Sequence, residues 1–208
     1  MELLVKKIRL FVILIFVIIW STTVFAQTAV IEAFKKSYEL ERKGEFTKAA
    51  DELKKIYDKD SYEINLRLGW LDYQAGLFSE SAAYYTRAVY LKPYSEEAKL
   101  GLIYPKAALG HWDEVISLYK QILKNSPNNT LANYRLGLIY YGQKKYSEAY
   151  KYFSKVVDLY PFGYDGLLML AWTNLQLGKY REAKVLFNKV LLLSPDDKSA
   201  LQGLSLIK

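Results

Sequence analysis

The sequence of 208 residues contains no cysteine, one histidine and only five prolines. Without cysteine there are no disulfide bonds, no thiolate metal site and no cysteine nucleophile. One histidine leaves little for histidine-based catalysis or metal binding. Five prolines and eleven glycines exclude a collagen-like or proline-rich chain. Apolar side chains are abundant instead, since 51% of the residues are hydrophobic and 15% are aromatic, which is enough for a packed core.

The motifs that common enzyme classes require are also missing from the sequence. There is no glycine-rich phosphate loop, no HExxH motif and no GxSxG motif. His111 stands in a predicted turn, where no nucleophile or carboxylate is expected to converge on it. The acidic pairs at 96–97 and 196–197 stand at predicted helix starts, where carboxylates complement the helix dipole. We therefore predict a protein that is not an enzyme, with no cofactor and no metal.

The first 26 residues have the order of a secretory signal peptide. Three basic residues within positions 6–9 precede an apolar run over 10–20, and small residues follow up to Ala26. This order predicts export with cleavage after Ala26. An uncleaved membrane anchor is the alternative, although residues 10–26 are fewer than the roughly 20 that a spanning helix needs.

Both interpretations place the rest of the chain outside the cytoplasm, because basic residues before an apolar segment stay on the cytoplasmic side. We expect an exported protein, periplasmic or secreted, or one anchored in the inner membrane and facing the periplasm. Contact with the membrane is then expected only through an uncleaved signal segment. An exported chain without a basic recognition motif is not expected to bind nucleic acid.

A repeat of about 34 residues runs through the remaining chain. Five segments align without gaps, and their starts are 32, 34, 34 and 34 residues apart. Each begins with Gly or Lys, carries an aromatic residue two positions later and ends on a bulky residue. The segments are GEFTKAADEL (44–53), GLFSESAAYY (76–85), GHWDEVISLY (110–119), KKYSEAYKYF (144–153) and GKYREAKVLF (178–187), and a proline follows eight residues later in the last four.

This pattern resembles the tetratricopeptide repeat (TPR), a helical hairpin of 34 residues. The resemblance covers residues 30–197 and implies an all-α fold, an α-solenoid of five hairpins wound as a right-handed superhelix. The TPR domain would span residues 27–208. Residues 198–208 match the first part of a sixth repeat and are predicted to form a capping helix. The five predicted repeats are 30–61, 62–95, 96–129, 130–163 and 164–197.

Local features agree with helical hairpins, and the third repeat departs from the pattern. Ser95, Thr130 and Asp197 stand where the following helix needs an N-cap. In the third repeat Ile103 replaces a small residue. The same repeat has Pro105 inside its predicted first helix, so we predict a kink near 101–104, and an early end of the helix is the alternative.

In TPR proteins the first helices line a concave groove that receives a peptide or partner segment, and the resemblance implies the same surface here. The matching positions are mostly aromatic, which suits an apolar or aromatic peptide, a partner helix or a glycan stacked on the rings. Ordinary packing between repeats is the alternative. The predicted groove residues are Phe34, Tyr38, Leu66, Trp70, Tyr73, Tyr104, Tyr134, Tyr141 and Trp172.

The predicted function is that of a non-catalytic scaffold for protein–protein interaction in the cell envelope. It would bind a peptide or helix of another envelope protein and assist the assembly of an envelope complex. One alternative is an accessory protein that binds carbohydrate or peptidoglycan or serves polysaccharide export. Another is a structural spacer within an oligomer. The lysines of the second helices are expected to face solvent, or else an anionic partner in the envelope.

Overall fold

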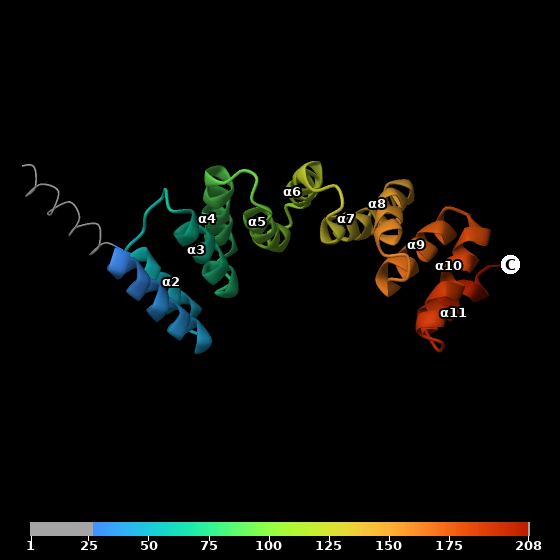
Figure 1. The fold of residues 1–208 in the computed structure, drawn as a ribbon, viewed down its shortest axis with the longest axis horizontal. Helices are drawn as coiled ribbons and strands as arrows, with labels where there is room; N and C mark the ends of the chain where they lie inside the picture. Colours follow the sequence, from blue (N-terminus) through green and yellow to red (C-terminus); the bar gives the residue numbers. More distant parts are fainter. Residues whose placement is uncertain (1–26, 208) are drawn as a thin grey trace, which may run out of the picture. The chain divides into compact units, whose positions relative to one another are not determined.

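The computed structural model describes residues 27–207, so the predicted signal peptide at 1–26 lies outside the described residues, as does Lys208. Within this part all regular secondary structure is helical (Figure 1). The all-α prediction is therefore confirmed. None of the helices between residues 27 and 207 combines the length and the hydrophobicity that a membrane span requires.

A first helix covers residues 27–42, and α2 follows it as a short helix of 9 residues. From α3 to α10, helices of 13 and 14 residues alternate, which is the sequence of first and second helices in successive hairpins. The bounds are α2 Phe46–Lys54, α3 Tyr62–Gln74, α4 Phe78–Leu91, α5 Glu96–Ala108, α6 Trp112–Asn125, α7 Thr130–Gly142, α8 Tyr146–Leu159, α9 Tyr164–Gln176, α10 Tyr180–Leu193 and α11 Lys198–Ser205.

The chain divides into two compact units between Leu109 and Gly110. In the N-terminal unit, α3 packs against α2, α4 and α5. In the C-terminal unit, consecutive helices pack against each other from α6 to α11. The division falls inside the third predicted repeat, which is also the repeat whose sequence departs from the pattern at Ile103 and Pro105.

Polar side chains cap several first helices. Ser95 Oγ and Asp197 Oδ1 each accept a hydrogen bond from the third backbone N–H of the helix that follows, at 3.1 and 2.7 Å, so these two predictions are confirmed. The prediction for Thr130 is wrong, because Asn129 caps α7 through its Oδ1 at 2.9 Å. Thr130 is already the first helical residue, whereas Asn129 has the extended backbone that a cap needs.

Helix α5 continues through Pro105 and ends at Ala108, so the alternative that it ends early is wrong. The N–H of Leu109 donates to the carbonyl of Pro105 at 3.0 Å, which keeps the helix regular beyond the proline. Proline inside a helix costs about 3 kcal/mol when nothing compensates. The Pro105 ring is buried, and the burial of its apolar surface offsets part of the cost.

The turn inside each hairpin needs a left-handed backbone at one position. Four of the five repeats have glycine there, with φ between 73° and 78°. The fourth repeat has Lys144, whose φ is 59°. A side chain with a Cβ atom is strained by about 1–2 kcal/mol in this region, whereas glycine is not. The Gly or Lys that starts each aligned segment therefore marks the turn residue.

Replacing Lys144 with glycine should stabilise the C-terminal unit by about 1 kcal/mol, because it removes the strain of the left-handed backbone. Urea denaturation followed by circular dichroism measures the difference. The matched control is Lys145→Gly, since Lys145 precedes α8 with a negative φ of −86°. That control should not stabilise, and an equal gain in both variants would contradict the account.

One buried polar side chain in each of three successive repeats fastens the first helix to the loop before it. Asn65 Nδ2 donates to two loop carbonyls at 2.7 and 3.1 Å. Asn133 Nδ2 donates to the carbonyl of Pro127 at 3.0 Å. Lys99 occupies the equivalent position, is 2% exposed and donates from Nζ to the carbonyl of Pro93. These bonds give the polar atoms of the buried side chains hydrogen-bond partners, which buried polar groups need.

Candidate functional site

A hollow of about 530 Å³ lies in the N-terminal unit, around α3. The helix over 27–42, α4 and α5 also contribute to its wall. We call it the N-terminal hollow. Four of the predicted groove residues line it. The lining consists of Phe34, Tyr38, Tyr62, Glu63, Leu66, Arg67, Trp70, Tyr85 and Glu97.

Three aromatic side chains at this surface remain exposed, one from each of three successive first helices. Tyr38, Trp70 and Tyr104 are 45%, 38% and 53% exposed. The ring centroid of Tyr73 lies 6.5 Å from that of Trp70 and 5.6 Å from that of Tyr104, so the Tyr73 ring lies between the other two and packs near both. Exposed aromatic side chains that gather in one place mark an interaction surface, whereas isolated ones do not.

A partly buried ion pair holds two of these rings in place. The Glu41 carboxylate accepts a hydrogen bond from Trp70 Nε1 at 2.7 Å and pairs with the guanidinium of Arg67. The Cζ atom of Arg67 lies 3.9 Å from the centroid of the Tyr38 ring. The hydrogen bond from Arg67, with a smaller contribution from that of Trp70, lowers the pKa of Glu41. The rings are thus ordered before any partner binds, which reduces the entropy cost of binding.

Two carboxylates stand at the starts of α3 and α5, where they line the N-terminal hollow. Glu63 Oε1 lies 3.4 Å from Lys92 Nζ. Glu97 Oε2 accepts a hydrogen bond from the hydroxyl of Tyr62 at 3.1 Å. Within residues 27–207 Glu97 has no ion pair, so its charge is offset by this neutral donor and by the dipole of α5, in whose first turn it stands.

Leu66 and Tyr73 of the predicted groove are partly buried on α3. Sequence reasoning missed Glu41 and Arg67 as members of this site. The Glu41–Arg67 pair joins residues 26 positions apart, and no local motif indicates such a contact. Glu97, in contrast, can be placed here from the sequence, because it precedes Tyr104 by seven residues and therefore shares its helix face.

The remaining predicted groove residues lie in the C-terminal unit and are partly buried. The Trp172 ring packs edge-on against Phe187, with centroids 5.3 Å apart, and its Nε1 donates to Ser199 Oγ at 2.8 Å. Tyr134 packs edge-on against Phe153, with centroids 5.8 Å apart. Both side chains therefore contribute to packing between helices as well as to the surface.

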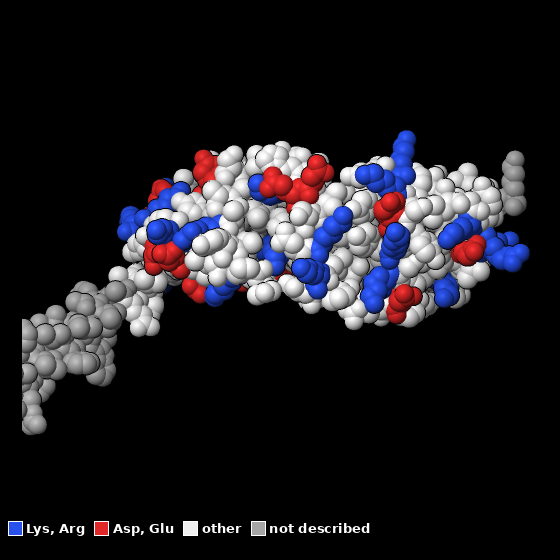
Figure 2. Space-filling model, turned by 90° about the horizontal axis from the view of Figure 1, so that it is seen from above, with Lys and Arg blue, Asp and Glu red and all other residues white. Residues whose placement is uncertain are grey.

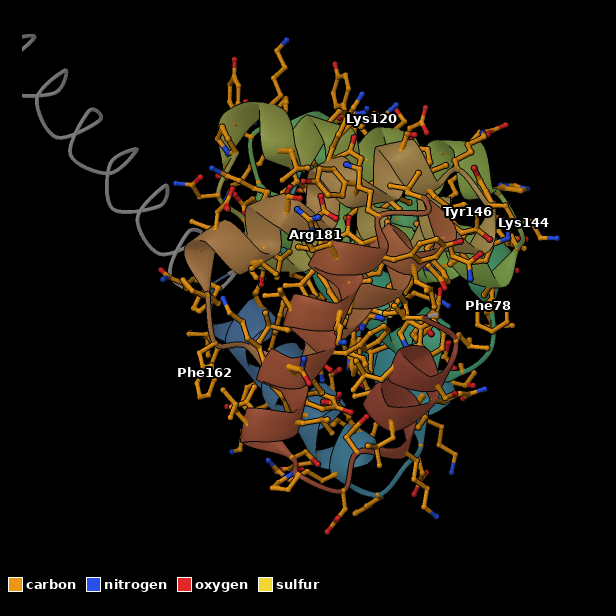
Figure 3. All side chains as sticks on the ribbon, turned by 90° about the vertical axis from the view of Figure 1, so that its right-hand side faces the viewer. Phe78, Lys120, Lys144, Tyr146, Phe162 and Arg181 are labelled. Atoms are coloured by element: carbon orange, nitrogen blue, oxygen red, sulfur yellow. The ribbon has the colours of Figure 1, made fainter. Side chains whose placement is uncertain are left out.

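Smaller hollows occur in the C-terminal unit. One of about 320 Å³ is lined by Tyr134 and by residues of α7, α8 and α9, and another of about 370 Å³ lies beside Trp112 and α7. Tyr141 contacts Tyr146, with ring centroids 5.3 Å apart. Phe162, on the loop before α9, is 58% exposed and projects away from the helices (Figure 3).

Charged residues do not form a single patch on the face that Figure 2 shows. Lys and Arg are interspersed there with Asp and Glu, and uncharged areas lie between them. His111 Nδ1 lies 3.1 Å from Glu114 Oε1 at the start of α6, and both side chains are about half exposed. Among residues 27–207 there is no cluster of three His, Asp or Glu side chains that could hold a metal ion.

Comparison with known proteins identifies repeats over most of the chain. A family model described as tetratricopeptide repeat matches residues 34–96 and 106–164. A second model with the same description matches residues 140–205. The first alone covers more than half of the chain. None of the curated proteins matches this chain.

Several solved structures have a similar fold. A tetratricopeptide repeat protein from Parabacteroides merdae has a TM-score of 0.73 and 22% identity, over 86% of this chain and 72% of that one. MamA from Desulfovibrio magneticus has a TM-score of 0.68 and 19% identity, over 82% and 97%. YrrB, described as a TPR protein with an unusual peptide-binding site, has a TM-score of 0.69 and 15% identity, over 89% and 97%. At these identities the likeness shows the fold alone.

Proposed function

Because the chain belongs to the tetratricopeptide repeat family, we propose that it is a non-catalytic scaffold whose N-terminal hollow binds a peptide segment of another protein. The observation that carries the proposal is the row of exposed rings at Tyr38, Trp70 and Tyr104 beside this hollow. Such rings supply a large contact area at a small cost in conformational entropy. A volume of about 530 Å³ accommodates a few side chains of an extended segment.

Two further points support a peptide as the ligand. The ion pair of Glu41 and Arg67 fixes the rings in the unbound protein, and a pre-ordered surface is what a flexible peptide needs to bind. A protein of the same fold, YrrB, is described by its peptide-binding site. A glycan is the alternative ligand, since exposed rings also stack on sugars. Titration with soluble peptidoglycan fragments separates the two.

We propose in addition that the chain is exported and acts in the cell envelope, on a partner protein there. The order of basic, apolar and small residues over 1–26 supports this proposal. Mass spectrometry of the protein isolated from cell fractions provides the test. We expect the chain to begin at Gln27 in a periplasmic or secreted fraction, whereas an uncleaved chain in the cytoplasm would contradict the proposal.

The double variant Trp70→Ala, Tyr104→Ala should lower peptide affinity by 100-fold or more, since each ring behaves as a hot spot worth about 2 kcal/mol. Peptides selected by the purified protein from a phage-displayed library of random dodecapeptides serve as ligands. Fluorescence anisotropy measures their affinity, and circular dichroism checks the fold.

The matched control for this double variant is Tyr94→Ala. Tyr94 is 82% exposed in the same unit and does not line the N-terminal hollow. Its loss should change the affinity less than twofold. Equal affinity in the control and the double variant, or a library that yields no binding peptide, would contradict the proposed function.

A further inference from the structure

We propose that the segment bound in the N-terminal hollow carries a Lys or Arg side chain that pairs with Glu97. An aromatic or aliphatic side chain about three residues away packs on Trp70 and Tyr104. This inference rests on the proposed function and adds the chemistry of the ligand, which is a basic and apolar peptide rather than an acidic one.

The charged side chains that line the hollow favour a basic ligand. Arg67 is compensated by Glu41, with which it pairs. Glu63 is partly compensated by Lys92 at 3.4 Å. Glu97 lines the same hollow, and among residues 27–207 it has no basic partner. The charge that remains to be neutralised in this hollow is therefore negative, so a cationic side chain complements it.

The rings of this site already accommodate cations. The Arg67 guanidinium stacks on Tyr38 at 3.9 Å, and Lys92 Nζ lies 4.0 Å from the centroid of the Tyr62 ring. Aromatic faces attract Lys and Arg because of the negative potential of the ring face. An acidic side chain would gain nothing from these rings and would be repelled by Glu63 and Glu97.

The spacing of Glu97 and Tyr104 on α5 sets the distance between the basic and the apolar side chain of the bound segment. Glu97 and Tyr104 are seven residues apart on one face of the helix, which corresponds to about 10.5 Å along its axis. Glu63 and Trp70 repeat this arrangement on α3. A polyproline II segment presents every third residue on the same side and advances about 9 Å in three residues. A basic residue and an apolar residue three positions apart therefore fit the site.

The dodecapeptide selection described above also tests the ligand chemistry. We expect the selected sequences to be enriched in Lys or Arg with an aromatic or aliphatic residue about three positions away. The variant Glu97→Gln should then bind such a peptide about tenfold more weakly and lose part of the salt dependence of binding. The control Glu80→Gln, an acidic residue in the first turn of α4 that does not line the hollow, should change affinity less than twofold.

A charge-swap variant distinguishes the loss of one ion pair with the peptide from a general loss of peptide affinity. Glu97→Lys should reject the basic peptide and bind the same peptide with its basic residue changed to Glu. Selected peptides without basic residues that bind through Trp70 and Tyr104, unaffected by Glu97→Gln, would overturn this inference and leave the proposed function standing. Selected peptides that are insensitive to the ring variants as well, or a selection with no enrichment, would overturn both.

Discussion

Replacing Gly101 with alanine is expected to lower the free energy of unfolding of the N-terminal unit by about 2–3 kcal/mol. A Cβ atom at Gly101 would stand 2.1 Å from Tyr85 Cε1, far inside any real contact distance. Helix α3 limits movement of the Tyr85 ring away from α5, because a Cβ atom at Gly69 would stand only 2.7 Å from the ring. The ring is 5% exposed and fills the space between α3 and α5.

Urea denaturation and hydrogen exchange at the amides of α3 to α5 measure this loss. The control is Gly142→Ala, since Gly142 is helical and no atom lies within 4 Å of its added Cβ. That variant should gain about 0.5–1 kcal/mol through the better helix propensity of alanine. In a Tyr85→Leu background, Gly101→Ala should cost less than in the wild type. An equal cost in both backgrounds would contradict the role of the ring.

Deleting residues 198–208 is expected to destabilise the C-terminal unit by about 3–5 kcal/mol, as the removal of a buried cluster of side chains does. Helix α11 covers the end of the core formed by Phe187 and Val190, both 0% exposed, and buries its own Ala200. A Cβ atom at Gly203 would stand 2.2 Å from the Phe187 ring, which shows how closely α11 covers it. A stack of repeats without its end cap exposes this core to water.

The control for the deletion keeps α11 and changes its outer face. Leu201 is 47% exposed, so Leu201→Ser should change the free energy of unfolding by less than about 0.5 kcal/mol. Urea denaturation followed by circular dichroism compares the two. A deletion that unfolds at the same urea concentration as the full chain would show that α11 is not a structural cap.

The sequence allowed the helices and the bulky core residues to be predicted, because both follow from the repeat itself. The period of 34 residues places Tyr85, Phe153 and Phe187 at one position of each repeat, and all three are buried. The contacts of Gly101 and Gly203 could not be predicted in this way. Each receives the ring of the preceding repeat, so the contact depends on how successive repeats pack and not on a pattern within one of them.

The candidate site, too, could be predicted from the sequence only in part. The repeat placed aromatic residues on the first helices, but the exposure of each ring depends on its neighbours. Tyr38 and Trp70 remain exposed, whereas Trp172 is covered in part by its contacts with Phe187 and Ser199. The ion pair that orders the rings joins different repeats, and only the three-dimensional structure brings its members together.

The indole N–H resonance of Trp70 in a two-dimensional ¹⁵N–¹H spectrum tests the central claim most directly. This group donates to Glu41 at the edge of the N-terminal hollow. Titration with a selected dodecapeptide should shift the Trp70 resonance, assigned through Trp70→Phe, and leave those of Trp112 and Trp172 in place. An unchanged Trp70 resonance at saturating peptide, with a shift at Trp112 or Trp172 instead, would contradict binding at this hollow.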